Sequence, residues 1–208
     1  GIIPQSAGSC YRPAKTDPEI AMEKALAEDI TGLVLAGGRG SRMGGIDKGL
    51  AMYRGRPLVA TVTERLERQV SEIVVSCNRN HAQYRTHAAT VITDVRPGFQ
   101  GPLAGIESCG STLRTSMLAV VACDSPALPL DLVARLSRGL RDENGGVFAY
   151  DGERPQYLFA LLRRHSLATL QDYLDAGGRS VKGWYELINA TAVDFSDQSK
   201  GFTNINRP

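Results

Sequence analysis

Long apolar runs are missing from this sequence of 208 residues, although 42% of them are hydrophobic. No run approaches the roughly 18 consecutive apolar residues that a membrane-spanning helix needs, and the first residues lack the pattern of a signal peptide. An excess of charge is missing too, because the net charge is only +2. We therefore expect no membrane partner and no nucleic-acid partner, and any functional positive charge has to be local.

Paired cysteines and clustered histidines are also missing. The four cysteines form no C-x-x-C pair, and the three histidines have no metal-ligand spacing. This pattern excludes the usual structural zinc sites. Isolated cysteines are typical of reduced thiols, so we expect a cytoplasmic protein.

The beginning of the chain differs from the rest. Its first residues, GIIPQSAGSCYRPAKTDPE, are rich in turn formers and have no hydrophobic period. We interpret residues 1–29 as an N-terminal extension, either tag-derived or disordered, and leave open whether it is native. Residues 30–208 contain no repeat, low-complexity tract or linker, so we expect a single domain there.

Short apolar runs alternate with helical periodicity along that domain. The expected strands are 32–36, 72–77, 89–94, 116–124, 146–151, 157–162 and 190–195. The expected helices are 57–70, 101–113, 129–140 and 166–177. Such alternation predicts an α/β fold in which helices cover both faces of a mostly parallel sheet.

Polar side chains follow four of the expected strands. A glycine-rich loop follows the first strand, Ser76 and Asn78 the second, Asp94 the third, and Asp124 the most apolar one. Ligands of open α/β sheets bind beyond the carboxyl ends of the strands. These side chains are therefore expected to converge on one cleft.

The glycine-rich loop lies within LVLAGGRGSRMGGIDKG, which holds six glycines and three cations. It is not a Walker loop, because Ile46 stands where the lysine belongs. Nor is it a dinucleotide fingerprint, since Met43 replaces the third glycine. Glycines let backbone N–H groups approach phosphate oxygens, and Arg39, Arg42 and Lys48 would neutralise a polyphosphate. The alternative is a solvated surface loop, which this density of glycines and cations disfavours.

Two aspartates at strand ends allow two interpretations each. Asp124, before Ser125 and Pro126, could hold Mg²⁺ between triphosphate oxygens or cap the following helix. Asp131 is better placed for capping, which favours the metal. Asp94 could be a turn residue or a ligand contact.

These blocks together resemble a known family. LAGGRGSRMGGIDKGL, GPLAGI, ACDSP, VDFSD and GFTNIN occur in the order typical of the molybdenum cofactor guanylyltransferases, the MobA family. The resemblance covers residues 31–206. It implies a three-layer, Rossmann-like sheet of the nucleotidyltransferase type. It also implies transfer of GMP from GTP to molybdenum-molybdopterin, which forms molybdopterin guanine dinucleotide and pyrophosphate with Mg²⁺ as cofactor.

The resemblance implies a role for individual residues. Lys48, Arg42 and Asp124 would be catalytic, with Asp124 as the metal ligand. Those contacting GTP would be Leu35, Ala36, Gly37, Gly38, Lys48, Ser76, Asn78, Asp94 and Asp124. Those contacting the acceptor would be Arg179, Asn204 and Asn206. Gly38 favours GTP over CTP, because relatives that transfer cytidylate read L-A-A-G.

The chain departs from the family pattern in two places. Ser76 is shorter than the asparagine that other members can carry, and Arg207 replaces the threonine of N-T-P. Three alternatives stay open: CTP as donor, a sugar phosphate as acceptor, or a cofactor-binding protein without activity. Molybdoenzymes, their chaperones and other cofactor-biosynthesis proteins are the partners that the resemblance implies.

Overall fold

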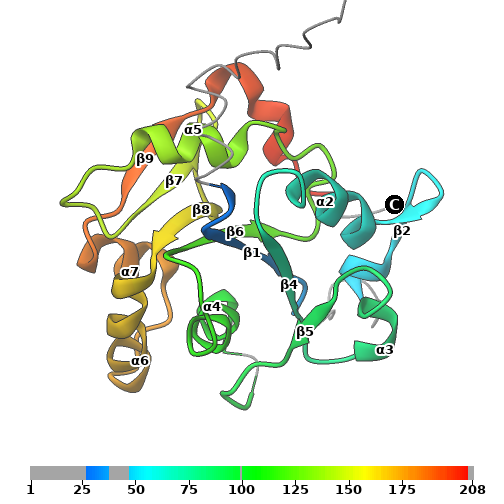
Figure 1. Cartoon of the computed structure of the whole chain (residues 1–208), viewed down its shortest axis with the longest axis horizontal. Helices are drawn as coiled ribbons and strands as arrows, with labels where there is room; N and C mark the ends of the chain where they lie inside the picture. The colour runs from blue at the N-terminus through cyan, green and yellow to red at the C-terminus, as the bar shows by residue number, and fades with distance from the viewer. Residues whose placement is uncertain (1–26, 38–46, 99, 206–208) are drawn as a thin grey trace, which may run out of the picture.

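The computed structural model describes residues 27–37, 47–98 and 100–205. A seven-stranded sheet forms its centre (Figure 1). The strands are β1 (Ile30–Leu35), β4 (Glu72–Ser76), β5 (Thr90–Ile92), β6 (Met117–Ala122), β7 (Gly146–Tyr150), β8 (Pro155–Arg163) and β9 (Thr191–Asp194). A small hairpin, β2 (Met52–Tyr53) with β3 (Arg56–Pro57), stands apart from this sheet.

The helices occupy both sides of the sheet. They are α2 (Leu58–Leu66), α3 (His81–Tyr84), α4 (Pro102–Gly110), α5 (Leu132–Gly139), α6 (Ala168–Asp175) and α7 (Val181–Leu187). Short 3-10 turns are η2 (Lys48–Leu50), η3 (Arg164–Leu167) and η4 (Ser196–Phe202).

The strand order is β5-β4-β1-β6-β8-β7-β9. β1 pairs in parallel with β4 and β6, β4 with β5, and β7 with β9. β8 is antiparallel to both of its neighbours, β6 and β7. It forms a hairpin with β7 across the turn that contains Gly152. The prediction of a mostly parallel sheet is confirmed, with β8 as the exception.

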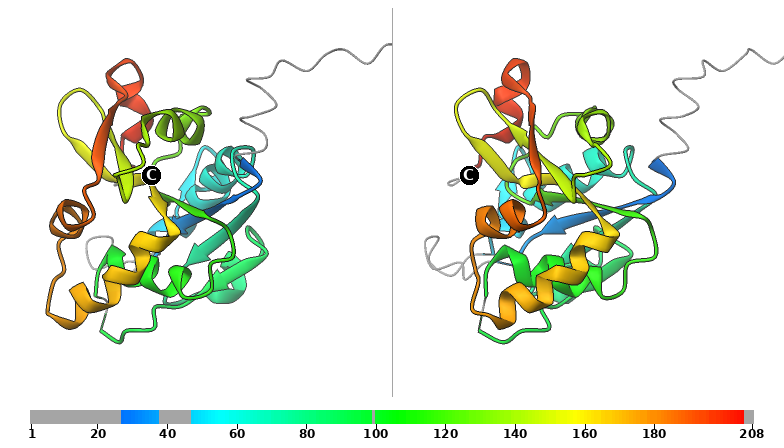
Figure 2. Two further views of the ribbon diagram at one scale, coloured as in Figure 1. Left: turned by 60° about the vertical axis from the view of Figure 1, so that its left-hand side comes forward. Right: turned by 90° about the vertical axis from the view of Figure 1, so that its left-hand side faces the viewer.

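Alternate residues of the central strand face the two helical layers. Val121 and Ala119 of β6 belong to a core cluster with α2 and α5, whereas Leu118 and Val120 belong to a cluster with α4, α6 and α7. This period of two is what an extended strand buried on both faces requires. Figure 2 shows the two helical layers with the sheet between them. The predicted three-layer arrangement is confirmed.

Two local predictions need correction. Asp131 is at the N-cap position of α5, but its side chain makes no capping hydrogen bond and instead accepts from Gln198 Nε2 at 3.0 and 3.1 Å. Asp124 does not cap α5 either, because that helix begins at Leu132. The helix expected over 57–70 ends at Leu66.

Helix α7 was not predicted. Val181–Leu187 is only seven residues long, and Gly183 interrupts its apolar period. Ser180 caps it by accepting a hydrogen bond from the Gly183 N–H at 3.2 Å. Across the described ranges, no helix has the length and apolar character to cross a membrane.

Candidate active site

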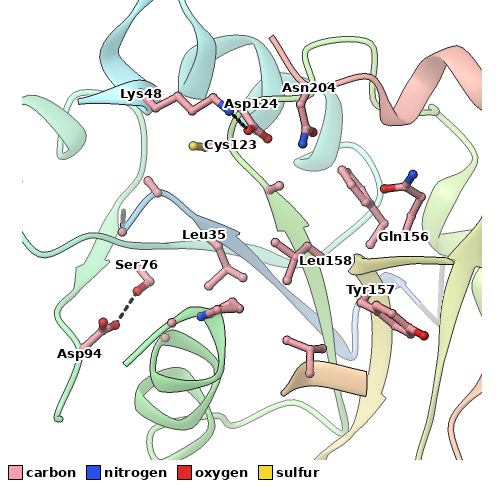
Figure 3. Close-up of a pocket in the computed structure, with 18 of the residues that line it drawn as sticks. Leu35, Lys48, Ser76, Asp94, Cys123, Asp124, Gln156, Tyr157, Leu158 and Asn204 are labelled. Atoms are coloured by element: carbon pink, nitrogen blue, oxygen red, sulfur yellow. Dashed lines mark hydrogen bonds and ion pairs between the residues drawn. The ribbon is translucent and has the colours of Figure 1, made fainter. Parts of the chain in front are cut away.

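A cavity of about 620 Å³ opens at the carboxyl ends of β1, β4 and β6. Leu35, Lys48, Ser76, Asp94 and Asp124 line it together with side chains from β8 (Figure 3). Of the strand-end side chains that the sequence singled out, Ser76, Asp94 and Asp124 therefore line one cavity, whereas Asn78 does not. The parallel strands cause this, because their carboxyl ends share one edge of the sheet.

Lys48 and Asp124 form an ion pair in this cavity. The Lys48 ammonium donates to Asp124 Oδ2. The side chains are 28% and 12% exposed, so the pair is largely shielded from water and its attraction is weakly screened. The other carboxylate oxygen, Asp124 Oδ1, is buried and has no hydrogen-bond partner within the described part of the chain. An unpaired buried carboxylate oxygen lowers the stability of the fold. As a hard oxygen ligand, Asp124 Oδ1 is available to a cation such as Mg²⁺.

Lys48 is held in place through the residue before it. The Asp47 carboxylate is buried and accepts from the Tyr84 hydroxyl and from Asn80 Nδ2 at 3.0 Å. Arg79 Nε lies 3.6 Å from the same carboxylate. On the other side of Lys48, Gly49 lies so close to Tyr84 that a Cβ would sit 2.5 Å from its hydroxyl. The sequence analysis missed this network, whose only signal was an acidic residue next to the candidate lysine.

Asp94 is oriented by the end of β4. It accepts from Asn78 Nδ2 at 2.7 Å and from Ser76 Oγ at 3.3 Å, and its own N–H donates to Asn78 Oδ1 at 3.1 Å. Ser76 and Asp94 line the cavity, whereas Asn78, which bonds Asp94, is not among the lining residues. The three side chains thus form one unit that presents the Asp94 carboxylate to the cavity.

Helix α4 comes unusually close to this unit. A Cβ on Gly105 would lie 2.8 Å from both Leu35 Cδ2 and Ser76 Oγ. The missing side chain lets the helix pack against the ends of β1 and β4. Gly101 and Pro102 at the start of α4 consequently reach the cavity lining.

The predicted acceptor residues are placed differently from one another. Asn204 lines the cavity and accepts from Ser125 Oγ at 2.9 Å. Arg179 does not line it: its guanidinium donates to Leu174 O at 2.8 Å, Gly178 O at 2.6 Å and Gln100 Oε1 at 2.6 Å. Its neighbours Ser180, Val181 and Lys182 do reach the lining. Four residues with a predicted role lie outside the described ranges: Gly38, Arg39, Arg42 and Asn206.

The sequence analysis missed the contribution of β8. Gln156, Tyr157, Leu158 and Phe159 line the cavity from the amino end of this strand. The carboxyl-end rule applies to parallel strands, whereas β8 is antiparallel to β6 and brings its amino end to the same edge. Recognising β7 and β8 as a hairpin would have found them.

The thiol in the cavity is not an activated nucleophile. Cys123 is buried beside Asp124. Burial, together with the Asp124 charge, raises the pKa of the Cys123 thiol well above its usual range, so the thiol is protonated. No group of three or more His, Cys, Asp or Glu side chains with metal-site geometry occurs in the described ranges.

Comparison with known proteins agrees with this geometry. Residues 32–189 match the model of the MobA-like NTP transferase domain. The molybdenum cofactor guanylyltransferase of Shewanella frigidimarina is 40% identical over 184 residues, 88% of this chain and 94% of that protein. The enzyme of the same name from Yersinia pestis is 42% identical over 180 residues, 86% of this chain and 92% of that protein.

Solved structures show the same fold. Molybdopterin-guanine dinucleotide biosynthesis protein A from Archaeoglobus fulgidus superposes with a TM-score of 0.70 at 22% identity, covering 86% of this chain and 93% of that one. A 4-diphosphocytidyl-2C-methyl-D-erythritol synthase from Anaerococcus prevotii gives 0.65 at 12% identity, covering 90% and 93%. The predicted nucleotidyltransferase fold and the predicted resemblance are both confirmed. The chain belongs to the MobA-like NTP transferases and, among them, to the molybdenum cofactor guanylyltransferases.

Proposed function

We propose that this chain transfers GMP from GTP to molybdenum-molybdopterin, the reaction implied by its family, and releases pyrophosphate. The observation that carries the proposal is the shielded Lys48–Asp124 pair at the strand-end cavity, with one carboxylate oxygen unpaired. An ammonium beside an incompletely coordinated carboxylate is what a triphosphate and its counter-cation require.

The proposed reaction needs no protein nucleophile. A terminal phosphate oxygen of molybdopterin bonds to the α-phosphorus of GTP, and the bond from that phosphorus to the bridging oxygen of pyrophosphate breaks. Positioning and charge neutralisation supply most of the rate enhancement in such transfers. Lys48, with Arg42 from the glycine-rich loop, stabilises the charge that develops on the leaving pyrophosphate.

We assign Mg²⁺ to Asp124. The buried, unpaired Oδ1 is a hard oxygen ligand of the kind this ion prefers. The absence of a larger acidic cluster among the described residues also fits, because Mg²⁺ commonly takes one or two carboxylates and completes its shell with phosphate oxygens and water. When bound, the ion would supply Lewis-acid polarisation of the phosphate oxygens.

The guanine is proposed to lie over the end of β1. Leu35, Ala36 and Gly37 line the cavity there, with Gly38 following them in sequence. The unit formed by Ser76, Asn78 and Asp94 stands next to them, because a Cβ on Gly37 would be 3.2 Å from Asn78 Nδ2. The donor is thus proposed to occupy the β1–β4 side of the cavity.

The acceptor is proposed to occupy the opposite side. Asn204 supports this assignment by its place in the lining. Arg179 would have to exchange its present backbone and Gln100 partners to reach a ligand, and Asn206 is assigned by family resemblance alone. We further propose a cytoplasmic location, with molybdoenzymes, their chaperones and other cofactor-biosynthesis proteins as recipients and partners.

A pyrophosphate-release assay with GTP, CTP and ATP, each with no acceptor, with molybdopterin or with a sugar phosphate, tests the proposal. Release that requires both GTP and molybdopterin is the expected result. Release with CTP and molybdopterin would make the chain a cytidylyltransferase, and release with a sugar phosphate instead would change the acceptor class. GTP binding without release under any condition would indicate a binding protein.

A further inference from the structure

The turn between β7 and β8 is organised by a buried carboxylate. Asp151 is 9% exposed and directly follows β7. Its Oδ1 accepts the backbone N–H groups of Glu153 at 2.9 Å and Arg154 at 2.8 Å. Its Oδ2 accepts from the Gln156 side-chain amide at 2.5 Å. The turn therefore does more than reverse the chain, because it also holds a side chain that lines the cavity.

The Asp151 carboxylate fixes which end of the Gln156 amide faces the cavity. An ionised carboxylate only accepts hydrogen bonds, so the amide nitrogen has to point at Asp151 and the amide oxygen away from it. Burial opposes ionisation of Asp151, but the backbone N–H groups of Arg154 and Glu153 and the Gln156 amide outweigh it and lower its pKa. Figure 3 shows the Gln156 oxygen on the cavity side. It accepts no hydrogen bond from the residues that the structure describes.

Asn204 offers the complementary group on the same wall. Ser125 is fully buried, and its hydroxyl donates to Asn204 Oδ1 at 2.9 Å. The Asn204 nitrogen is thereby directed into the cavity (Figure 3). The adjacent Ile205 N–H donates to Asp124 O at 2.8 Å, which attaches this segment to the end of β6. An acceptor on Gln156 and a donor on Asn204 thus both face the cavity, each oriented by a second residue.

We propose that Gln156 Oε1 accepts the N–H on the lactam edge of the acceptor's heterocycle, an N–H beside a C=O, and that Asn204 Nδ2 donates to the same ligand. Gln156 is then a specificity-determining residue, and Asp151 is the positioning residue that orients it. An oriented acceptor discriminates against rings that lack the matching N–H, because the half-buried Gln156 oxygen would be left unpaired.

Both guanine and a pterin carry such an edge, so the side of the cavity decides between them. This step rests on the proposed function, which places the guanine over β1 and β4. β8 lies on the other side of β6 from those strands. The Lys48–Asp124 pair, from η2 and the end of β6, lies between the two sides. The edge at Gln156 therefore belongs to the pterin.

Gln156→Leu tests the proposal, because leucine keeps the volume and removes the acceptor. The steady-state KM for molybdopterin and the KM for GTP are measured separately by pyrophosphate release. We expect the KM for molybdopterin to rise about 10-fold, the size of one unmade hydrogen bond at a partly buried site, with the KM for GTP unchanged. Gln171→Leu, on the exposed face of α6 and outside the cavity lining, is the matched control and should change neither.

Asp151→Asn tests the positioning role without touching the cavity wall. An asparagine can donate as well as accept, so it permits the Gln156 amide to turn and present its nitrogen. The KM for molybdopterin should rise as in Gln156→Leu, and the double variant should be no worse than Gln156→Leu alone. Additive losses would show that Asp151 serves only the turn and would overturn its assigned role.

The outcomes separate this inference from the proposed function. Wild-type release that depends on GTP and molybdopterin is required first, and its failure would be a failure of the proposed function. With that activity present, an unchanged KM for molybdopterin in Gln156→Leu would overturn the inference. A rise in the KM for GTP alone would overturn it as well, because the edge recognised would then be that of guanine.

Discussion

Tyr84 donates its phenolic hydrogen bond to Asp47, the residue immediately before Lys48. Burial, with the neighbouring Asp47 charge, raises the pKa of Tyr84 far above its usual range, so the hydroxyl remains a donor at any working pH. Asn80 and Tyr84, from the segment after β4 that includes α3, thereby hold Asp47 in place. The neighbouring Lys48 pairs with Asp124. A buried network outside the cavity thus determines where its ammonium stands.

Tyr84→Phe should lower both stability and activity. The substitution removes the hydroxyl and leaves a buried Asp47 oxygen unpaired, which costs about 1–3 kcal/mol. Chemical denaturation would measure the loss in the free energy of unfolding. A loss below about 0.5 kcal/mol would mean that the hydrogen bond contributes little.

A double-mutant cycle with Lys48→Ala separates positioning from general destabilisation. If Tyr84 acts on turnover through Lys48, Tyr84→Phe should reduce kcat in the wild-type background and have almost no further effect in the Lys48→Ala background. Independent, additive reductions in kcat would contradict the positioning role. Assays well below the unfolding temperature of each variant keep the folded fraction constant.

Asp124→Asn should nearly abolish turnover. The substitution keeps the shape but removes the charge that pairs with Lys48 and the ligand proposed for Mg²⁺. Loss of one such electrostatic group corresponds to about 3–4 kcal/mol of barrier, or a fall in kcat of about 10²–10³-fold. Asp131→Asn, which alters an aspartate whose side chain accepts from Gln198 outside the cavity lining, is the matched control and should retain full activity. Near-normal turnover in Asp124→Asn would contradict the metal assignment.

Asn78→Ala should weaken GTP binding more than it slows turnover. Asn78 makes two hydrogen bonds with Asp94 and is not among the residues that line the cavity. Without it the Asp94 carboxylate loses its fixed orientation, and the KM for GTP should rise about 10-fold. The KM for molybdopterin, measured at saturating GTP, serves as the internal control. An equal rise in both KM values would contradict the assignment of Asp94 to the GTP side of the cavity.

The pH dependence of stability should include a contribution from Asp151. Its pKa in the folded protein is lower than the value of 3.8 of an unperturbed aspartate. The folded state therefore binds this proton less readily than the unfolded state, and the stabilisation is full above pH 3.8 and is lost as the pH falls through the folded pKa. Unfolding free energies measured from pH 6 down to about pH 3 should fall less steeply for Asp151→Asn than for the wild type. Parallel curves would contradict a lowered Asp151 pKa.

The sequence predicted the main strands and four of the helices because their apolar periods are strong. β6 reads MLAVVA without interruption and is buried throughout. The same periods do not reveal strand direction, so β8 was predicted as a strand, but its antiparallel direction and the cavity residues it carries were missed. The Asp151–Gly152 pair is a recognised hairpin signal, and the positive φ of Gly152, +97°, shows why a glycine is there.

The candidate site, too, was predictable from the sequence only in part. Lys48, Ser76, Asp94 and Asp124 were predictable because each follows a parallel strand or the loop after it. The residues that orient them were not, since Tyr84 lies 36 residues along the chain from Lys48 and only the fold brings the two together. Asp47 and Asn80 are ordinary loop residues by composition, and only the fold brings them into the hydrogen bond beside Lys48.

The fate of the α-phosphate of GTP tests the central claim most directly. GTP labelled on the α-phosphate is incubated with the protein, Mg²⁺ and molybdopterin, and the products are separated by chromatography. The account predicts that the label moves into a molybdopterin guanine dinucleotide while an equal amount of unlabelled pyrophosphate appears. Label that stays in GTP, or that is released as free GMP or GDP, would contradict it.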